Sequence, residues 1–208
     1  MGRRTKQLST EQVCGYHSYS YTQRELLRSY EIRNPGQQNY DCSIWEAARA
    51  TTAAPLFFKK ISLKAGGATF VDGAIRLNNP IYELAREAER LYPSRRIGCI
   101  VSIGTGWPKR TSIHGSKLHN IAQACVQIAL DAQGKAEEFV NDKDGKELRR
   151  AQKYFRFNVE QGLQDIEIEE WKRMEEMDAM TTDYLSQANN AEQIERCAQA
   201  LISSSTFS

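Results

Sequence analysis

The carboxylate of Asp72 is the side chain in this sequence that is best placed to do chemistry. It follows the apolar residues Phe70 and Val71 and precedes Gly73, so the sequence predicts a strand that runs into a glycine turn. A carboxylate at the end of a strand can project into a cleft and act as a general base, and a glycine beside it allows close backbone approach. The same Asp-Gly dipeptide is also a common turn signal, in which the aspartate only bonds local N–H groups.

A base of this kind needs a nucleophile, and Ser102 is the first candidate. It lies near the end of the apolar run 97–103, two residues before Gly104. A nucleophile elbow, the strained turn that exposes a catalytic serine, requires G-x-S-x-G because side chains do not fit on either flank. Ile100 stands at the first glycine position, and no two glycines in the 208 residues are four apart. We therefore interpret Ser102 as a packed strand residue, and an improvised nucleophile, Ser102 or a cysteine, is the less favoured hypothesis.

Other candidate groups are weaker. The loop Gly104-Thr105-Gly106 could cradle an anion through its backbone N–H groups, but a simple tight loop is favoured because no G-x-G-x-x-G or Walker pattern is present. His17, His114 and His119 have no spacing that suggests a metal site or a triad. We expect no metal and no cofactor.

Composition describes an ordinary soluble globular protein. Of the 208 residues 40% are hydrophobic and 26% charged, and the formal net charge is +2, which does not point to a nucleic-acid partner. The five cysteines are dispersed without paired spacing, which is typical of reduced intracellular thiols and predicts a cytoplasmic protein. No apolar stretch is long enough for a transmembrane helix.

The elements predicted around Asp72 alternate between helix and strand. Ser43 and Glu46 form a capping-box pattern that predicts a helix start. The further predictions are a hairpin of strands 60–63 and 68–71, a helix opened by Asn79-Pro80, a buried parallel strand at 97–103, a helix at 121–132, a strand at 154–159, and helices at 167–185 and 192–202. Residues 1–25 show no clear period and are predicted to be irregular. This order indicates an α/β fold.

The order of these motifs closely resembles the C-terminal half of a patatin-like phospholipase domain. The residues that carry the resemblance are SIWEAARATTAAPLFF (43–58), FVDGA (70–74), NNP (78–80) and IVSIGTG (100–106), and it extends through YFRFNV (154–159) and EEW (169–171). The later stretch is similar to patatin domains of filamentous fungi, which are often parts of larger multidomain proteins.

The resemblance implies a lipid acyl hydrolase with a three-layer α/β sandwich and a mostly parallel sheet. Such enzymes use a serine–aspartate dyad without histidine or metal, and the aspartate of their D-G-[GA] motif acts as the base, a role that maps onto Asp72. A glycine-rich loop supplies the oxyanion hole. The implied substrates are phospholipids or acylglycerols, with transient contact to a lipid surface.

The sequence departs from the family pattern at the nucleophile. The resemblance places the first strand, its glycine-rich loop and the G-x-S-x-G elbow upstream of Arg28, yet residues 1–27 contain neither motif. We therefore expect a domain that is incomplete at its N-terminus, with residues 1–25 irregular and 26–208 forming the C-terminal portion of the patatin-like domain. We expect this chain to be inactive alone and to self-associate through unpaired sheet edges. The alternative is a non-catalytic remnant that acts as a lipid-binding or protein-interaction module.

Overall fold

The computed structural model describes residues 13–17, 24–31, 39–54, 58–63, 69–73, 77–107, 131–166 and 170–205. The chain divides into two compact units, Met1–Asn78 and Asn79–Ser208. The sequence shows no linker at this point, because the division falls inside the Asn-Asn-Pro motif that opens a helix.

The first unit contains a four-stranded antiparallel sheet with the strand order β2-β1-β4-β3. Its strands are β1 (Val13–His17), β2 (Arg24–Leu27), β3 (Ile61–Ser62) and β4 (Thr69–Asp72). The hairpin predicted from strands 60–63 and 68–71 is confirmed by the pairing of β3 with β4. The prediction that residues 1–25 are irregular is wrong for β1 and the start of β2. A strand without an alternating pattern forms here because β2 and β4 pair with its backbone on both edges.

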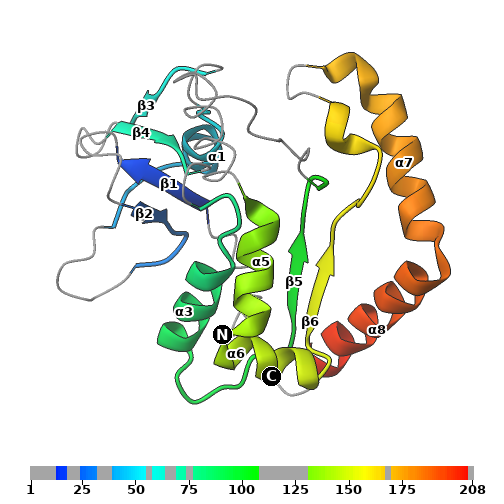
Figure 1. Ribbon diagram of the computed structural model, residues 1–208. Helices are drawn as coiled ribbons and strands as arrows, with labels where there is room; N and C mark the ends of the chain where they lie inside the picture. The colour runs from blue at the N-terminus through cyan, green and yellow to red at the C-terminus, as the bar shows by residue number, and fades with distance from the viewer. Residues whose placement is uncertain are drawn as a thin grey trace, which may run out of the picture. The chain divides into compact units, whose positions relative to one another are not determined.

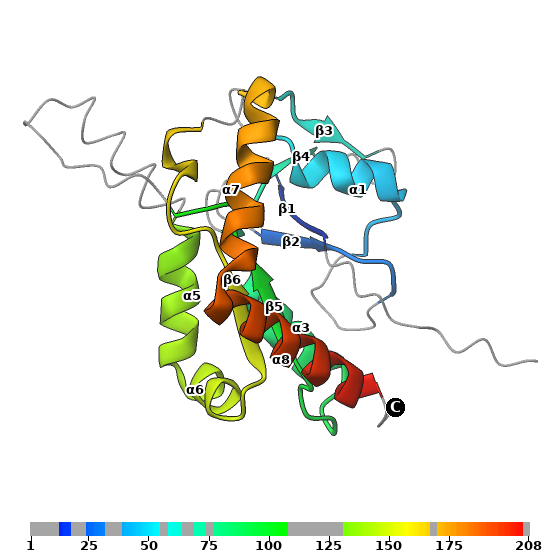
Figure 2. The same cartoon turned by 90° about the vertical axis from the view of Figure 1, so that its right-hand side faces the viewer.

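The helix α1 (Ile44–Thr51) packs against this sheet, as Figure 2 shows. Its start agrees with the predicted capping box, since the backbone N–H of Ser43 donates to the carboxylate of Glu46 at 2.9 Å. The small residues Ala47 and Ala50 are buried and allow the helix to lie close to Phe70 of β4. The core of this unit comprises Leu27, Tyr40, Ala47, Ala50, Leu63 and Phe70.

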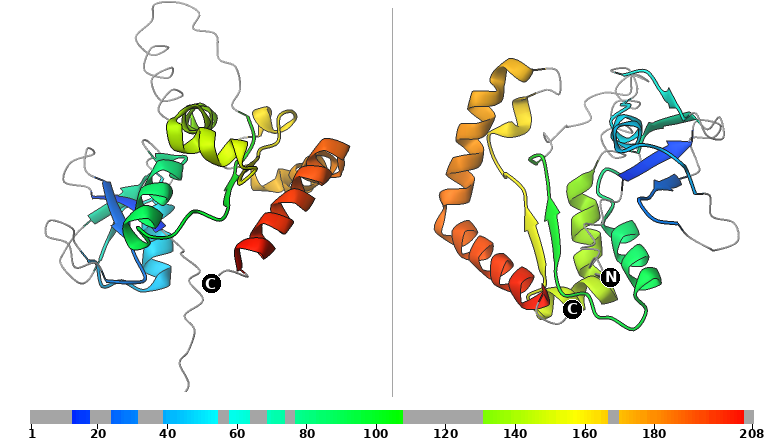
Figure 3. Two further views of the ribbon diagram at one scale, coloured as in Figure 1. Left: turned by 90° about the horizontal axis from the view of Figure 1, so that it is seen from below. Right: turned by 180° about the vertical axis from the view of Figure 1, so that it is seen from behind.

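The second unit contains a parallel pair of strands, β5 (Ile100–Ile103) and β6 (Tyr154–Phe157), with Ser102 opposite Arg156. Figures 1 and 3 show the two strands lying between α5 on one side and α7 and α8 on the other. The helices are α3 (Ile81–Leu91), α5 (Ala132–Asn141), α6 (Lys143–Arg150), α7 (Met174–Ser186) and α8 (Ala188–Ser205). The buried residues Ile81, Ile100, Phe139 and Leu148 join α3, β5, α5 and α6 in one core.

These elements confirm an α/β fold class. The parallel strand predicted at 97–103 is β5, and the strand predicted at 154–159 is β6. The prediction that the first of these is buried holds for Ile100 and Ser102 but is wrong for Ile103, which is exposed. The parallel pairing is limited to this pair, since every other strand pairing in the described ranges is antiparallel. The three-layer arrangement stays a prediction. The helix predicted at 121–132 lies outside the described residues except for its last two positions.

The helix α3 begins one residue later than predicted, and Asn79 has a different role. The first capping position is Pro80, whose carbonyl accepts the N–H of Leu84 at 2.9 Å. The Asn79 side chain is buried and donates to the carbonyl of Ala132 at 3.0 Å, at the start of α5. Asn79 therefore connects α3 with α5 and does not cap α3.

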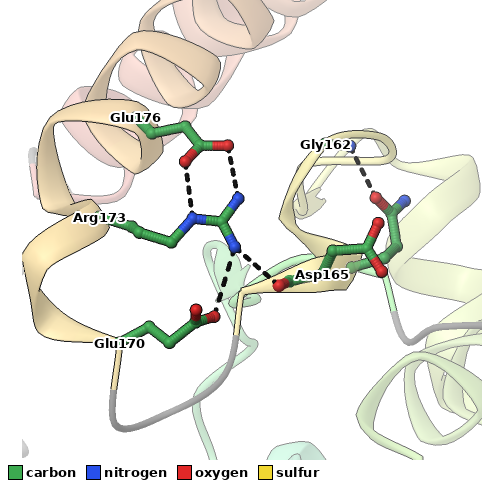
Figure 4. Close-up of polar contacts among 6 residues, drawn as sticks. Gly162, Asp165, Glu170, Arg173 and Glu176 are labelled. Atoms are coloured by element: carbon green, nitrogen blue, oxygen red, sulfur yellow. Dashed lines mark hydrogen bonds and ion pairs between the residues drawn. The ribbon is translucent and has the colours of Figure 1, made fainter.

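An arginine clamp joins the segment before α7 to its first turn (Figure 4). The 3₁₀ turns η1 (Leu163–Asp165) and η2 (Trp171–Arg173) precede α7. Arg173 donates two hydrogen bonds of 2.7 Å to the carboxylate of Glu176 and one of 2.8 Å to the carbonyl of Asp165. This bidentate geometry fixes the direction in which α7 leaves the turn.

No helix in the described ranges is long and apolar enough to cross a bilayer.

Candidate functional site

Asp72 is the last residue of β4, where the strand enters the turn at Gly73. Its Cα lies opposite Gly15 of β1 in the antiparallel register. Its backbone N–H donates to the carbonyl of Ala53 at 3.1 Å, just after the end of α1. On the other side, the carbonyl of Gly73 accepts the N–H of Leu77 at 2.7 Å. The backbone that carries the carboxylate is thus held by a strand, a helix end and a turn.

In β4, the apolar residues that hold the strand in the core are buried more deeply than the carboxylate of Asp72. Phe70 and Val71 are buried, and the ring of Tyr40 contacts that of Phe70 edge-on, with 5.1 Å between the ring centroids. Gly73 is also buried, whereas Asp72 between them is only partly buried. A partly exposed carboxylate on a rigid strand end can take up a proton from a group that docks against it.

Ser102 lies in the second unit as a packed strand residue, as its flanks predicted. Only 8% of its surface is exposed, and its hydroxyl accepts a hydrogen bond of 3.0 Å from Nη1 of Arg156. The hydroxyl therefore lies inside the β5–β6 pair beside a guanidinium, without the exposed turn that a serine nucleophile needs.

The loop after β5 uses its N–H groups internally. The N–H groups of Gly104, Gly106 and Trp107 donate to the Phe157 carbonyl, the Asn158 Oδ1 atom and the Val159 carbonyl at 2.8, 2.8 and 3.0 Å. Gly106 has φ 108, a left-handed conformation that favours glycine. This is the tight loop that the sequence favoured, and these three groups do not form an anion cradle.

Reasoning from sequence missed two polar residues, Arg156, which is partly buried, and Asn158, which is buried. The carbonyl of Arg156 accepts a hydrogen bond of 3.2 Å from Gln193 of α8, and Asn158 donates from its side chain to Gln133 of α5 at 3.1 Å. Burial lowers the pKa of the Arg156 guanidinium. The alternation of residues 154–159 could have revealed Arg156, since it shares a strand face with Tyr154 and Asn158.

Comparison with known proteins finds a family match that covers most of the first unit. The family model described as patatin-like phospholipase matches residues 4–85, a range that includes β1 to β4 and Asp72. The match begins inside the segment that was predicted to be irregular, which agrees with the presence of β1 there.

The similar full-length proteins are phospholipases of plants and mammals. Phospholipase A I of Arabidopsis thaliana is 31% identical over 138 residues, which cover 64% of this chain and 10% of that protein. Calcium-independent phospholipase A2-gamma is 29% identical over 140 residues in Oryctolagus cuniculus, covering 63% of this chain and 17% of the relative. The Homo sapiens protein of the same name is 29% identical over 150 residues, covering 72% of this chain and 18% of the relative.

The chain thus spans less than a fifth of the length of these relatives, and no solved structure matches it. The similarity to fungal domains stays a prediction. The 150 residues aligned with the human protein exceed the length of the first unit, so the similarity continues into the second. Residues 4–85, with Asp72 at the end of β4, match the patatin-like phospholipase family.

Proposed function

We propose that this chain supplies the aspartate base of a lipid acyl hydrolase that uses a serine–aspartate dyad. The observation that carries the proposal is the position of Asp72, at the end of a strand whose backbone is held on both sides, inside the residues that match the family. The names of the relatives, all phospholipases, support an ester of a glycerolipid as the substrate class.

The chemistry assigned to Asp72 is proton transfer. The serine hydroxyl attacks the ester carbonyl while the Asp72 carboxylate takes its proton, and the tetrahedral intermediate expels the alcohol, which leaves with that proton. Water then hydrolyses the acyl-enzyme through the same carboxylate. An amide at this position cannot accept the proton, so the step depends on the acid–base property of the side chain and not on its shape.

The nucleophile of this reaction is not assigned to any residue of the 208. The sequence contains no G-x-S-x-G, and Ser102 is buried against Arg156. We therefore propose that the serine comes from a segment outside these residues, and that the chain alone does not turn over substrate.

The experiment joins the 208 residues, in one polypeptide, to an upstream segment from a patatin-like domain that carries the glycine-rich loop and the G-x-S-x-G elbow. This fusion should hydrolyse a fluorogenic phospholipid. Asp72→Asn should lower kcat by at least about a hundredfold, since a general base contributes that much or more. The matched control is Asp178→Asn on the exposed surface of α7, which should keep full activity.

Two outcomes would contradict the proposal. Turnover by Asp72→Asn at the rate of the control would show that Asp72 is not the base. A covalent fluorophosphonate adduct on the folded 208-residue chain without the upstream segment would show that the chain holds its own nucleophile. The adduct is read by intact mass, and peptide mapping would name the residue.

The remaining proposals concern where the protein acts. We propose transient contact with a lipid surface and a cytoplasmic location, supported by the substrate class and by the free thiols of Cys42, Cys99 and Cys197. Sedimentation with phosphatidylcholine vesicles and imaging of a fluorescent fusion would test these two points.

A further inference from the structure

The guanidinium of Arg156 has an unusual environment for a charge inside a protein. Its Nη1 atom donates to the Ser102 hydroxyl at 3.0 Å. Its Nε atom is buried and has no hydrogen-bond partner among the described residues. Nε and Nη2 form one edge of the planar group, so a whole edge of two donors is left without an acceptor there. Arg156 is partly buried, and a cation with a buried donor that lacks an acceptor is costly unless an anion accompanies it.

The neighbours of Arg156 in the described ranges are neutral. The side chains that act on its charge are those of Tyr154 and Tyr184, and no carboxylate contributes to its electrostatics in that part of the chain. The hydroxyl of Tyr154 lies near Ser102, is buried, and also has no hydrogen-bond partner in the described structure. Two hydrogen-bond donors, the Arg156 guanidinium and the Tyr154 hydroxyl, therefore lie near one another without an acceptor. Such a pair is expected where an acceptor from outside the chain binds.

Gly104 packs closely against the Nη2 end of the guanidinium. A Cβ atom at this position would lie 2.6 Å from Nη2 of Arg156 and would also collide with the Asn158 side chain. Any side chain at position 104 would therefore displace Nη2, whereas glycine lets the guanidinium keep its place.

The sequence around β5 supplies no negative charge. Residues 91–130 contain no aspartate or glutamate, although the chain as a whole is nearly balanced at a net charge of +2. The charged residues of this stretch are all basic: Arg95, Arg96, Lys109, Arg110 and Lys117. The excess of positive charge favours an anion from outside the chain over an internal ion pair.

We propose that Arg156, with the hydroxyls of Tyr154 and Ser102, forms a binding site for a phosphate group. A tetrahedral oxyanion can accept two parallel hydrogen bonds from the Nε–Nη2 edge and a third from the Tyr154 hydroxyl at the same time. The phosphate of a lipid headgroup and free inorganic phosphate share this chemistry.

The test measures the binding of inorganic phosphate to the complete chain by titration calorimetry and by the shift in melting temperature, against sodium chloride at the same ionic strength. The unchanged chain should bind phosphate and melt at a higher temperature. Arg156→Met should raise the Kd at least about tenfold, the effect of losing a charge-assisted hydrogen bond. Arg150→Met, which removes an exposed cation of α6, should bind as the unchanged chain does.

Two further variants separate binding from folding. Tyr154→Phe removes a buried hydroxyl without a described partner, so its stability without phosphate should equal or exceed that of the unchanged chain, while its phosphate Kd rises. If Arg156→Met does not fold, Arg156→Lys keeps the positive charge but lacks the two-donor edge, and should show the same loss. Equal phosphate affinity in the Arg156 variants and the unchanged chain, or no binding by the folded chain, would overturn the site.

The source of the phosphate is decided by vesicles. The unchanged chain is sedimented with phosphatidylcholine vesicles that contain phosphatidic acid. If it sediments with them, and if Arg156→Met or an excess of inorganic phosphate abolishes this, the site binds a lipid headgroup. Phosphate binding without such sedimentation assigns it to a small soluble anion. Phosphate binding at this site does not depend on hydrolysis, so Asp72→Asn should bind phosphate with unchanged affinity. The phosphate site and the role of Asp72 as the base can therefore fail independently of one another.

Discussion

The backbone at Asp72 depends on the close approach of Ala53. Ala53 is fully buried, and its carbonyl accepts the N–H of Asp72. Because Ala53 has no exposed surface, a longer side chain there would have to displace its neighbours and, with them, the backbone that holds the end of β4. The direction of the proposed base is therefore set by a residue that is distant in sequence and carries no chemistry of its own.

Enlarging Ala53 should displace Asp72. We expect Ala53→Leu to destabilise the fold by about 1–3 kcal/mol, the usual cost of overpacking a filled core, and to lower the activity of the fusion that contains the elbow. Urea denaturation and phospholipid turnover measure the two effects. Ala48→Leu, at an exposed position of α1, is the matched control, and equal results for both variants would contradict the role of Ala53.

The carboxylate of Glu176 makes the start of α7 sensitive to acid. Its hydrogen bonds from Arg173 lower its pKa below the usual 4.5. A carboxyl group whose pKa is lower in the folded state stabilises that state above its unfolded pKa, and this contribution is lost as the pH falls through the folded pKa. We expect the protection of amides in the first turn of α7, measured as exchange relative to the intrinsic rate at each pH, to fall below about pH 4.5, where an unperturbed glutamate is mostly protonated.

Glutamine substitution tests this assignment. Glu176→Gln should abolish the acid-dependent step in exchange, because the amide does not titrate, whereas the exposed neighbour substitution Glu175→Gln should leave it unchanged. An identical step in Glu176→Gln would show that another group is responsible.

Among the helices, α5 and α6 meet through backbone contact at Gly145. A Cβ atom on Gly145 would collide with the Phe139 carbonyl and lie 2.9 Å from the Cα of Val140. Gly134, near the start of α5, would meet only the carboxylate end of Asp131, which accepts its N–H at 2.7 Å. The two glycines therefore differ in whether their neighbour can move.

Alanine substitution should separate these two positions. Alanine inside a helix ordinarily stabilises it by about 1 kcal/mol relative to glycine. We expect Gly145→Ala to destabilise the chain by about 1–3 kcal/mol in spite of this, because backbone atoms must shift. Gly134→Ala should change stability by less than about 1 kcal/mol, since the Asp131 side chain can rotate. Urea denaturation of both variants measures the difference, and equal destabilisation would contradict the close contact.

Local sequence signals predicted the elements with short-range causes and missed those with long-range ones. Ser43 with Glu46 predicted the start of α1, and the apolar run before Gly104 predicted β5. Both signals can be recognised from sequence because a helix cap and an apolar strand each depend on residues that are close together along the chain. The strand β1 could not be predicted in this way, since it is held by backbone pairing with β4, more than fifty residues away. Arg156 was missed because its significance depends on Ser102 across the sheet.

The molecule as a whole presents a strand edge that invites association. Among the described residues, β5 pairs only with β6, and Ile103 at its end is 77% exposed. An unpaired edge next to an exposed apolar side chain is a template for another chain. We expect the 208-residue chain to self-associate at micromolar concentration and Ile103→Lys to reduce this, as measured by light scattering after size exclusion. A monomeric unchanged chain would contradict the prediction.

Phospholipid hydrolysis by the fusion of this chain with a G-x-S-x-G segment, compared between Asp72→Asn and Asp178→Asn, tests the central proposal most directly. The account predicts turnover in the fusion and in Asp178→Asn, and a loss of at least about a hundredfold in kcat for a folded Asp72→Asn variant. Turnover that survives in Asp72→Asn would contradict it, because the proposed base would then not be the one that the reaction uses.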